Sequence, residues 1–365
     1  MDFYIQEYKN QFKWEDSMTL KEIAKMAGVS VSTVSRVINH SNSKVASKEV
    51  QDTIWRIVRE TNYIPNSTAR NLKLGNSTEY VQPPMKTIGC IFARSNSTTN
   101  DPFFSQIARA IEQEAFRQGY IMKYSFSAYD INDANTFHMI SNNQVNGIAV
   151  LGRFDKNLLT FIKKQYKHVV YTGLNTIDTD FDQVICDGYE ASVAAIKYLH
   201  NLGHTSIGYV GEKNKELRYQ GYLDTMNSLS LSVTRENIIV TPLSSEGGYN
   251  GVKEFLEKGS PVTALFCAND LTAIGAMKAI KEQGLNVPSD ISIISIDDID
   301  TAQYVSPMLT TIHVPMEELG KMTAKILIDR IENGKNLPIK VELPFSIITR
   351  ESCVANDLIK RSNKK

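Results

Sequence analysis

Residues 19–38 read TLKEIAKMAGVSVSTVSRVI and predict two short helices joined by a tight glycine turn. Thr19 is a suitable helix N-cap and Glu22 stands three residues later, which is the spacing of a capping box. An apolar stripe follows at helical spacing, made of Leu20, Ile23, Ala24 and Ala27. Gly28 then ends the first helix, because glycine adopts the backbone conformation that a tight turn requires. The segment therefore has the layout of a helix-turn-helix.

The second helix would bury one face and leave another in solvent. Ser30 is a suitable N-cap for it. The residues at inward-facing spacing are Val34, Val37 and Ile38. The residues left outside are Val31, Ser32, Ser35 and Arg36. Hydroxyl and guanidinium groups on an exposed helix can meet base edges and phosphates, so the pattern predicts contact with the DNA major groove.

The alternative is an ordinary helical hairpin within a globular domain, which gives the same pattern. The next segment argues against it. Ser47 would start a third helix with apolar residues at helical spacing, namely Val50, Ile54, Ile57 and Val58. Three such helices can close a small core of their own, which favours a separate DNA-binding module.

The run from Thr19 to Gly75 resembles the DNA-binding headpiece and hinge of the LacI/GalR family of bacterial transcription regulators. AGVSVSTVSRVIN, beginning at Ala27, and NYIPN, beginning at Asn62, carry the resemblance. It implies that operator DNA is contacted from the helix-turn-helix and its flanks by Thr19, Ser30, Val31, Ser32, Thr33, Ser35, Arg36, Asn39 and Tyr63. It also implies a hinge helix in the minor groove, with contacts from Asn66, Ala69, Leu72 and Lys73.

Leu72 stands at the position where the family inserts a wedge between base pairs. Such a wedge costs roughly a few kcal/mol of unstacking, offset by the contacts that bent DNA allows. The alternative is that Leu72 and Leu74 pack on the core. A helix as short as Asn66 to Leu74 is marginal in water, so we expect DNA and a second subunit to order it.

Charge is distributed unevenly, although the whole chain carries 40 basic and 40 acidic residues and is formally neutral. Between Met18 and Gly75 there are nine lysines and arginines against four acidic residues. The region 18–75 is therefore basic and the rest of the chain is acidic, which indicates that only the basic region contacts DNA phosphates. The affinity of such contacts for DNA falls as the salt concentration rises.

Beyond Lys86 the pattern changes to apolar strands alternating with amphipathic helices. The strand-like runs are TIGCIFA, IMKYSF, GIAVLG, VVYTG, VICD, SIGYVG, ALFCA and ISIISID. The helices between them are expected at 104–118, 191–202, 219–228 and 271–283. This alternation predicts two parallel sheets with helices on both faces, and a ligand cleft at the carboxyl ends of the strands. The expected fold class is thus an all-α headpiece plus an α/β core of two doubly wound subdomains.

The region from Lys86 to Ser352 resembles the sugar-binding core of the same family and, more distantly, periplasmic sugar-binding proteins. The signatures are DGYEASVAAIKYLHNLGHTSIGYVG, ALFCANDLTAIGAMKAIKEQGLNVPSDISIISIDD and SPMLTTIHVP. The resemblance places polar groups in the cleft from Asn175, Arg218, Asn269 and Asp297. A guanidinium, amides and a carboxylate together suit the hydroxyls of a neutral sugar. Candidates to cover the sugar's C–H face are Phe103, Phe104 and Met316, although paired phenylalanines at a helix start are as often core residues. Ala93 is a weaker candidate for the cleft.

The sequence also bears on two other classes of function, an enzyme and a transport receptor. The sequence lacks G-x-G-x-x-G after a strand, G-x-x-x-x-G-K-[ST], G-x-S-x-G and H-E-x-x-H, so nothing completes a catalytic site around Asp297 and Asp298. We expect Asp298 to cap the segment that follows it, and His204 to be structural. A solute-binding receptor for transport remains the main alternative, but it would need an export signal and no basic helix-turn-helix.

The sequence composition also indicates the cellular compartment and whether a metal or cofactor is expected. The first seventeen residues carry charges throughout and have no apolar signal region, and no run approaches the length of a membrane span. Four widely separated cysteines have no ligand or disulfide spacing: Cys90, Cys186, Cys267 and Cys353. We therefore expect a cytoplasmic protein with reduced core thiols, without metal, cofactor or membrane partner.

The predicted organisation has five parts. They are an N-terminal extension (1–17), a headpiece (18–65), a hinge helix and linker (66–85), an effector-binding and dimerisation core (86–352) and a tail (353–365). The core would comprise an N-subdomain at about 86–186 and 316–342 and a C-subdomain at about 187–312 and 343–352. We predict a homodimeric repressor of sugar-utilisation genes that binds a pseudo-palindromic operator and responds to a small sugar, with galactose or a galactoside favoured by DPFFSQI, AVLGRFD and SIDDIDTAQY.

Overall fold

The computed structural model describes most of the chain, in eight ranges. These are residues 19–39, 46–61, 86–92, 101–127, 144–152, 156–259, 262–334 and 337–358. The expectations for Tyr63, for the hinge residues Asn66 to Leu74, for Ala93 and for the extension at 1–17 lie outside these ranges. The chain divides into two compact units, Met1–Pro84 and Met85–Lys365, each of which is described by itself.

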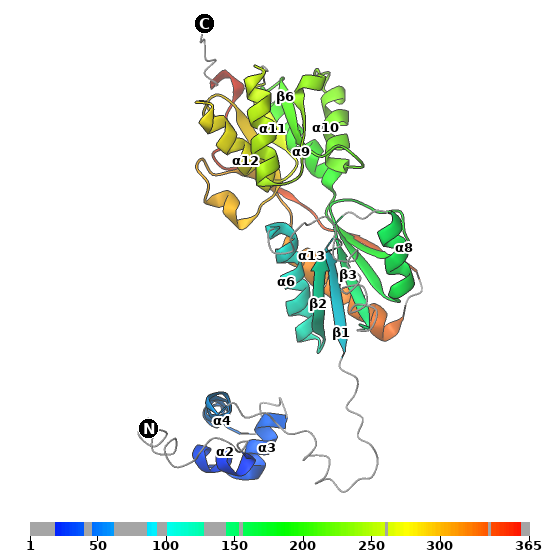
Figure 1. Cartoon of the computed structure of the whole chain (residues 1–365), viewed down its shortest axis with the longest axis vertical. Coiled ribbons are helices and arrows are strands. Elements are labelled where there is room, and N and C mark those ends of the chain that lie inside the picture. Colours follow the sequence, from blue (N-terminus) through cyan, green and yellow to red (C-terminus); the bar gives the residue numbers. More distant parts are fainter. Residues whose placement is uncertain are drawn as a thin grey trace. The chain divides into compact units, whose positions relative to one another are not determined.

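The described residues of the first unit form a headpiece of three helices (Figure 1). Its helices are α2 (Leu20–Ala27), α3 (Val31–Asn39) and α4 (Lys48–Glu60). They close a small apolar core made of Ile23, Ala24, Val34, Val37, Ile54 and Ile57. The predicted capping box is present, because the Thr19 amide donates to Glu22 Oε2 at 2.7 Å and the Glu22 amide donates to Thr19 Oγ1 at 3.4 Å. Gly28 ends α2 at φ 65°, the left-handed conformation expected of it.

The second unit contains two six-stranded sheets, each built mainly from parallel strands. The first sheet has the order β11-β5-β4-β3-β1-β2. Its strands are β1 (Thr87–Phe92), β2 (Ile121–Ser127), β3 (Gly147–Leu151), β4 (Val169–Gly173), β5 (Asp182–Ile185) and β11 (Lys340–Glu342). Its helices are α6 (Pro102–Arg117), α8 (Lys156–Gln165) and α13 (Met316–Asn333). We call this sheet and its helices the first subdomain.

The second subdomain is organised around the sheet β12-β10-β9-β8-β6-β7, in which only the β10–β12 pair is antiparallel. Its strands are β6 (Ile207–Gly211), β7 (Ile238–Val240), β8 (Ala264–Cys267), β9 (Ser292–Asp297), β10 (Thr310–His313) and β12 (Ser346–Ile348). Its α-helices are α9 (Gly188–Asn201), α10 (Leu217–Ser228), α11 (Ser245–Glu257) and α12 (Asp270–Glu282). Three short 3₁₀ turns are η2 (Arg235–Asn237), η3 (Asp300–Gln303) and η4 (Asn356–Leu358).

The chain passes between the two subdomains three times. The crossings follow β5 at Cys186, follow β10 at Val314 and follow β11 at Leu343. Figure 1 shows chain segments passing between the two subdomains where they meet. The predicted fold class is confirmed: a helical headpiece is followed by two parallel-sheet α/β subdomains.

Several element boundaries differ from those predicted. Helix α6 begins at Pro102 and α9 at Gly188 because Asp101 and Asp187 cap them, and the sequence reading had overlooked both caps. The short strands β7, β10, β11 and β12 were also overlooked. Strands of only three or four residues carry too little hydrophobic alternation to stand out in a sequence.

Helices α11 and α12 pack with almost no space between their backbones. A Cβ built on Gly248 would lie 2.1 Å from the Thr272 carbonyl oxygen, and one on Gly275 would lie 2.0 Å from the Ser245 carbonyl oxygen. Gly320 of α13 is placed similarly against α6, with the Ile107 carbonyl oxygen 2.5 Å from its built Cβ. These glycines allow close helix approach, which no other residue type permits.

His204 is fully buried just before β6, as a structural residue should be. Its Nε2 donates to the Val354 carbonyl oxygen at 2.9 Å, and its Nδ1 lies 2.9 Å from Thr263 Oγ1. Burial lowers the pKa of His204 below its ordinary value of 6.5, and the Val354 carbonyl offsets this only in part. The ring therefore ties the start of β6 to the C-terminal segment in its neutral form.

The cysteines match expectation as unpaired thiols. Cys90, Cys186 and Cys267 are buried, and Cys353 is half-buried with its Sγ 3.0 Å from the Ile293 carbonyl oxygen. No helix in the described ranges is long and apolar enough to cross a bilayer.

We expect Gly275→Ala to destabilise the second subdomain by about 1–3 kcal/mol or more, because the new methyl group must push against a backbone carbonyl rather than a movable side chain. Urea unfolding followed by circular dichroism measures this. Gly251→Ala is the matched control. A Cβ built on Gly251 lies 2.8 Å from a side-chain atom of Ile239 and not from backbone. Alanine also has a higher helix propensity than glycine. Equal losses in the two variants would contradict the packing argument.

The burial of His204 leads to a second prediction, on how the free energy of unfolding depends on pH. Its folded-state pKa lies below 6.5, so below pH 6.5 the unfolded chain binds a proton that the folded chain refuses, and stability is lost as pH falls. The stability difference between wild type and His204→Gln should therefore shrink between pH 7.5 and 5.5 on urea titration. Carboxylates that titrate in this range, such as Asp270, are present in both proteins and cancel. A difference that stays constant with pH would refute the assignment.

Candidate functional site

The headpiece presents one polar face on α3. Val31, Ser32 and Arg36 are exposed, whereas Val34 and Val37 are buried, so the outward and inward faces fall where the sequence placed them. Arg36 lies in the last turn of α3, with its guanidinium on the solvent side. The side chains best placed to reach base edges are thus those of the first turn of α3 and of Arg36.

Hydroxyl groups form a compact network at the start of α3. Ser30 Oγ accepts from the Thr33 amide at 3.1 Å and lies 2.7 Å from Ser32 Oγ and 2.8 Å from Thr33 Oγ1. Ser30 therefore caps the helix and holds neighbouring hydroxyls in one orientation. Thr19, at the start of α2, is exposed and also occupied in capping. Ser35 is half-buried on α3, and Asn39 is the last residue of that helix.

The predicted ligand residues of the core all follow parallel strands at their carboxyl ends. Asn175 follows β4, Arg218 is in the first turn of α10 after β6, Asn269 follows β8, and Asp297 ends β9. We call these four residues, together with Asp101 before α6, the junction site. Because the carboxyl ends of parallel strands share one edge of a sheet, each subdomain presents its polar groups on a single edge.

Arg218 is the central cation of the junction site and is only 7% exposed. Its Nε and Nη2 donate to the two oxygens of Glu216 at 2.8 and 3.0 Å, and its Nη1 donates to the Ala268 carbonyl oxygen at 2.7 Å. Burial alone would lower the pKa of Arg218, but the charge and hydrogen bonds of buried Glu216 raise it. The guanidinium thus stays charged. Glu216 is a partner that the sequence reading missed, although it stands only two residues before Arg218.

Asp297 is 3% exposed and adopts φ 136°, a conformation that residues other than glycine rarely hold. Burial raises the pKa of its carboxyl group well above the ordinary value, and the neighbouring carboxylate of Asp270 raises it further. Arg218 pulls that pKa down, while Asp101 pushes it up. The fold thus places a buried carboxyl group, with opposing influences from Asp270 and Arg218, at the carboxyl end of β9.

Asp101 is a second residue that the sequence reading missed. Its carboxylate caps α6, accepting from the amides of Phe103 and Phe104 at 3.1 and 3.3 Å. Burial raises its pKa, while those amides and the charge of Arg218 lower it. Asp101 belongs to the first subdomain and Arg218 to the second, so the charge of Arg218 acts on Asp101 from the other subdomain. The available signal was an aspartate placed before a proline at a helix start.

Two asparagines complete the junction site. Asn269 Oδ1 accepts from the Thr272 amide at 3.0 Å and from the Thr272 hydroxyl at 2.5 Å, so it caps α12. Asn175 is 7% exposed, and its Oδ1 has no hydrogen-bond partner among the described residues. A buried amide oxygen without a partner is costly, and a hydroxyl of a bound ligand would satisfy it.

The three predicted apolar covers differ in placement. Phe103 and Met316 are 5% and 3% exposed and belong to the hydrophobic core, whereas Phe104 is half-buried. The rings of Phe103 and Phe104 meet edge to face, with centroids 5.1 Å apart. Phe104 is therefore the apolar side chain with surface to offer a ligand.

Asp298 behaves differently from the prediction. Its side chain does not cap the following η3 turn; it pairs with Arg350 Nη2 at 2.6 Å and His313 Nδ1 at 2.9 Å. Those partners come from strand ends distant in sequence, which is why the sequence could not reveal them. No group of three or more metal-ligating side chains occurs within the described ranges.

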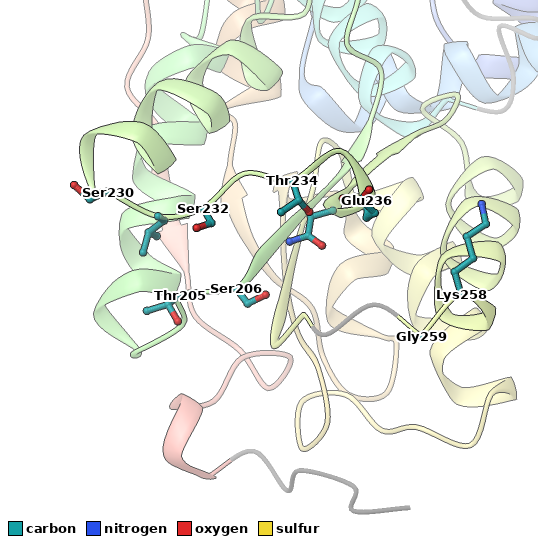
Figure 2. A pocket seen from close by; sticks show the side chains of 10 residues that line it. Thr205, Ser206, Ser230, Ser232, Thr234, Glu236, Lys258 and Gly259 are labelled. Atoms are coloured by element: carbon teal, nitrogen blue, oxygen red, sulfur yellow. The ribbon is translucent and has the colours of Figure 1, made fainter. Parts of the chain in front are cut away.

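A separate hollow of about 680 Å³ lies at the opposite end of the second sheet. Figure 2 shows Thr205, Ser206, Ser232 and Thr234 around it. These residues lie near the amino ends of the strands, whereas ligands of open parallel sheets bind at the carboxyl ends. This hollow is therefore separate from the junction site.

The headpiece and the core each match a known protein family. Residues 19–66 match the bacterial regulatory proteins of the lacI family, and residues 196–353 match the periplasmic binding protein-like domain. The chain is 31% identical to the HTH-type transcriptional repressor PurR of Escherichia fergusonii, over 92% of this chain and 96% of that protein.

Solved structures agree with this. A LacI family transcriptional regulator from Enterococcus faecium with bound ribose is 27% identical, with a TM-score of 0.64 over 74% of this chain and 99% of that one. The Lac repressor dimer bound to operator and the anti-inducer ONPF shares the fold, with 24% identity and a TM-score of 0.66 over 93% of this chain and 100% of that one. The helix-turn-helix, the two-subdomain core and the extent of the match to PurR lead to one conclusion: the chain is a DNA-binding transcriptional regulator and belongs to the LacI family.

Proposed function

We propose that this regulator represses sugar-utilisation genes by binding a pseudo-palindromic operator as a homodimer, and that a small neutral sugar bound at the junction site controls it. One observation carries the proposal. The junction site gathers buried carboxyl, amide and guanidinium groups from both subdomains, while a separate unit exposes Arg36 on a DNA-reading helix. Sensing and DNA reading are thereby divided between two parts of one chain.

The charges of the junction site favour a neutral, hydroxyl-rich ligand. Arg218 is already neutralised by Glu216, and Asp101 and Asp297 add two further carboxyl groups nearby. A phosphate or carboxylate ligand would face these acidic groups without a free cation among the junction-site residues to balance it. Sugar hydroxyls can instead donate to Asp297 and to the unpartnered Asn175 Oδ1, and accept from the Asn269 amide.

The ring of Phe104 is the proposed cover for the apolar face of the sugar. Phe103 and Met316 would then support the wall from the core. Galactose or a galactoside remains our preferred effector from the sequence, and ribose is a second candidate because the Enterococcus faecium relative binds it.

On the DNA side, we propose that the helix-turn-helix contacts are made by Thr19, Ser30, Val31, Ser32, Thr33, Ser35, Arg36 and Asn39. Tyr63 is a further proposed contact at the end of the headpiece, and the proposed hinge contacts are Asn66, Ala69, Leu72 and Lys73. A single small headpiece contacts too few bases to bind tightly alone, so two headpieces related by a twofold axis are required.

The test of the proposal is a thermal-shift panel of D-galactose, D-ribose, lactose and glucose 6-phosphate, followed by operator binding with and without each sugar that binds. The operator is first selected from random duplex DNA. We expect a neutral sugar to raise the melting temperature and to change operator affinity, because binding to the folded state stabilises it. Stabilisation by the sugar phosphate alone would contradict the proposed chemistry of the site.

We expect Asp297→Ala to abolish the sugar response while operator affinity of the ligand-free protein stays unchanged. Loss of a buried carboxyl partner costs about 1–3 kcal/mol per hydrogen bond, which is roughly a 10- to 100-fold loss of sugar affinity by calorimetry. Asp300→Ala is the matched control, because its side chain in the same loop bonds only to Gln303 among the described contacts. A normal sugar response in Asp297→Ala would remove Asp297 from the site.

Arg36→Ala tests the DNA-reading face. If Arg36 makes a bidentate contact to a guanine, the variant should lose about 1–3 kcal/mol of discrimination between operator and random DNA. Lys48→Ala, an exposed cation on α4, removes the same charge and should weaken both DNAs alike. Competition binding at fixed salt measures the ratio. Equal discrimination ratios in the two variants would show that Arg36 does not read bases.

A further inference from the structure

The hollow at the amino end of the second sheet is walled by three connections that converge there. Thr205 and Ser206 lead into β6, the segment 230–237 joins α10 to β7, and Lys258 and Gly259 follow α11. Figure 2 shows side chains from these connections around the hollow. Its volume of about 680 Å³ lies within the range of small-molecule sites, roughly 300–1,000 Å³. The hollow is therefore large enough for a ligand of its own.

The connection between α10 and β7 supplies most of the lining side chains, and its backbone is fixed by hydrogen bonds. The Leu231 amide donates to the Met226 carbonyl oxygen at 2.8 Å. The Asn237 amide donates to the Thr234 carbonyl oxygen at 3.2 Å. These bonds hold this wall in place without a ligand, so binding would not have to order it, which favours affinity.

Asn237 is the residue of the hollow whose chemistry points to a ligand. It is 8% exposed, and its side-chain amide has no hydrogen-bond partner among the described residues. Asn269, equally buried at the opposite end of the same sheet, instead bonds to the amide and the hydroxyl of Thr272. A buried side-chain amide without a partner is costly, and it can both donate and accept hydrogen bonds. A ligand hydroxyl in the hollow would satisfy it, because a hydroxyl also does both.

Hydroxyl groups line other parts of the hollow. Thr205, Ser232 and Thr234 are exposed, and their side chains make no hydrogen bond among the described residues. Thr234 in particular precedes η2 without capping it. Leu231 is half-buried and adds an apolar side chain. Hydroxyls, an amide and an apolar surface together match the O–H and C–H groups of a saccharide.

The charges of the hollow disfavour an anionic ligand. Lys258 Nζ is bonded to Glu254 Oε1 at 2.7 Å, whereas Glu236 has no ion pair among the described residues. A phosphate or carboxylate would therefore meet an open carboxylate and a cation that is already paired. One exposed carboxylate attracts a cation only weakly in water, so the buried neutral amide of Asn237 decides the class of ligand. That class is neutral and rich in hydroxyl groups.

We propose that the hollow is an additional saccharide-binding site, which takes a neutral mono- or disaccharide through the Asn237 amide and the hydroxyls of Ser232 and Thr234. It lies at the amino ends of the strands of the second sheet, whereas the junction site lies at the carboxyl ends. The two sites are therefore separate. The saccharide site does not rest on the proposed function, because it requires neither a ligand at the junction site nor a change in DNA binding.

A local probe in the full-length protein tests this site. A trifluoromethyl label is attached to Thr205→Cys in a Cys353→Ser background, while the remaining cysteines are buried and stay unlabelled. Its fluorine NMR shift is followed as D-galactose, lactose, maltose, glucose 6-phosphate and spermidine are titrated separately. The same label on Gln113→Cys of α6, which is exposed and does not line the hollow, reports non-specific effects of each compound.

We expect a saturable shift at Thr205→Cys with at least one of the three neutral sugars. No shift with any neutral sugar, or an equal shift at Gln113→Cys, would overturn the proposal. Saturation only by the sugar phosphate or only by spermidine would also overturn it, because the ligand class would then be charged.

Asn237→Ala should weaken binding of the sugar that shifts the label by about tenfold or more, because the hydrogen bonds of the buried amide to the ligand are lost. Asn227→Ala is the matched control and should leave the affinity unchanged, since Asn227 is an exposed residue of α10 that does not line the hollow. If Asn237→Ala does not fold, Thr234→Val decides the question. It removes an exposed hydroxyl and should weaken binding about threefold or more. Unchanged affinity in a folded Asn237→Ala, or in Thr234→Val where it replaces that variant, would contradict the assignment.

The Asp297→Ala variant separates the two sites. The label at Thr205→Cys should give the same titration curve in this variant, because Asp297 lies at the opposite end of the sheet. Loss of the shift in a folded Asp297→Ala would assign the signal to the junction site and overturn the proposal. If no sugar changes operator affinity, the proposed function fails, while the fluorine titration still decides whether the hollow binds a saccharide.

Discussion

The buried carboxylate of Asp270 is the interaction around which the functional end of the second subdomain is arranged. It accepts from Ser295 Oγ and Thr311 Oγ1, both at 2.6 Å, and from the Ile299 amide at 2.9 Å. These donors come from β9, β10 and the loop after β9, so one side chain at the start of α12 joins three segments. Burial raises the pKa of Asp270 to about 6, and the three hydrogen bonds oppose that rise. Without those donors a fully buried carboxylate would cost several kcal/mol.

The position of Asp270 determines what Asp297 and Asp298 can do. Ser295 and Ile299 are both bonded to Asp270, so Asp297 and Asp298, which lie between them, are held at the end of β9 in conformations they would not otherwise adopt. The Asp297 carbonyl oxygen then accepts from the Val314 amide, while the Asp298 carboxylate contacts His313 and Arg350. The three aspartates thus differ in their contacts: Asp270 supports the turn, Asp297 is the proposed ligand residue, and Asp298 bonds to His313 and Arg350.

The sequence predicted the architecture because local signals and long-range packing agree in most of the chain. Capping at Thr19, the turn at Gly28 and the inward spacing of Val34 and Val37 all appear in the structure, and each is set by residues fewer than ten positions apart. The buried strands were equally visible as continuous apolar runs. Fold class and the helix-turn-helix could therefore be read from the chain itself.

The contacts of the junction site were less predictable. Glu216 beside Arg218 and Asp101 across from it are ordinary helix caps in the sequence, and only folding gives them a second role as charges in a buried site. Asp298 illustrates the limit most clearly. Its partners are 15 and 52 residues away, and helix-start statistics favoured a local cap over both. Met316 and Phe103 were predicted as sugar contacts but are buried in the core. The sequence alone does not show whether an apolar residue near a strand end faces the core or a ligand.

Separate sites for the proposed sugar and for operator DNA have a thermodynamic consequence for regulation. If a sugar changes operator affinity by some factor, operator DNA must change sugar affinity by the same factor, because both equilibria share one set of conformations. The sugar can shift those conformations only by the difference in its affinity for them. In this chain that difference has a physical location, since the proposed ligand residue Asp297 bonds through its own backbone to the crossing at Val314. A response therefore requires that the contacts around Asp297, this bond included, differ in strength between the conformations that operator DNA distinguishes.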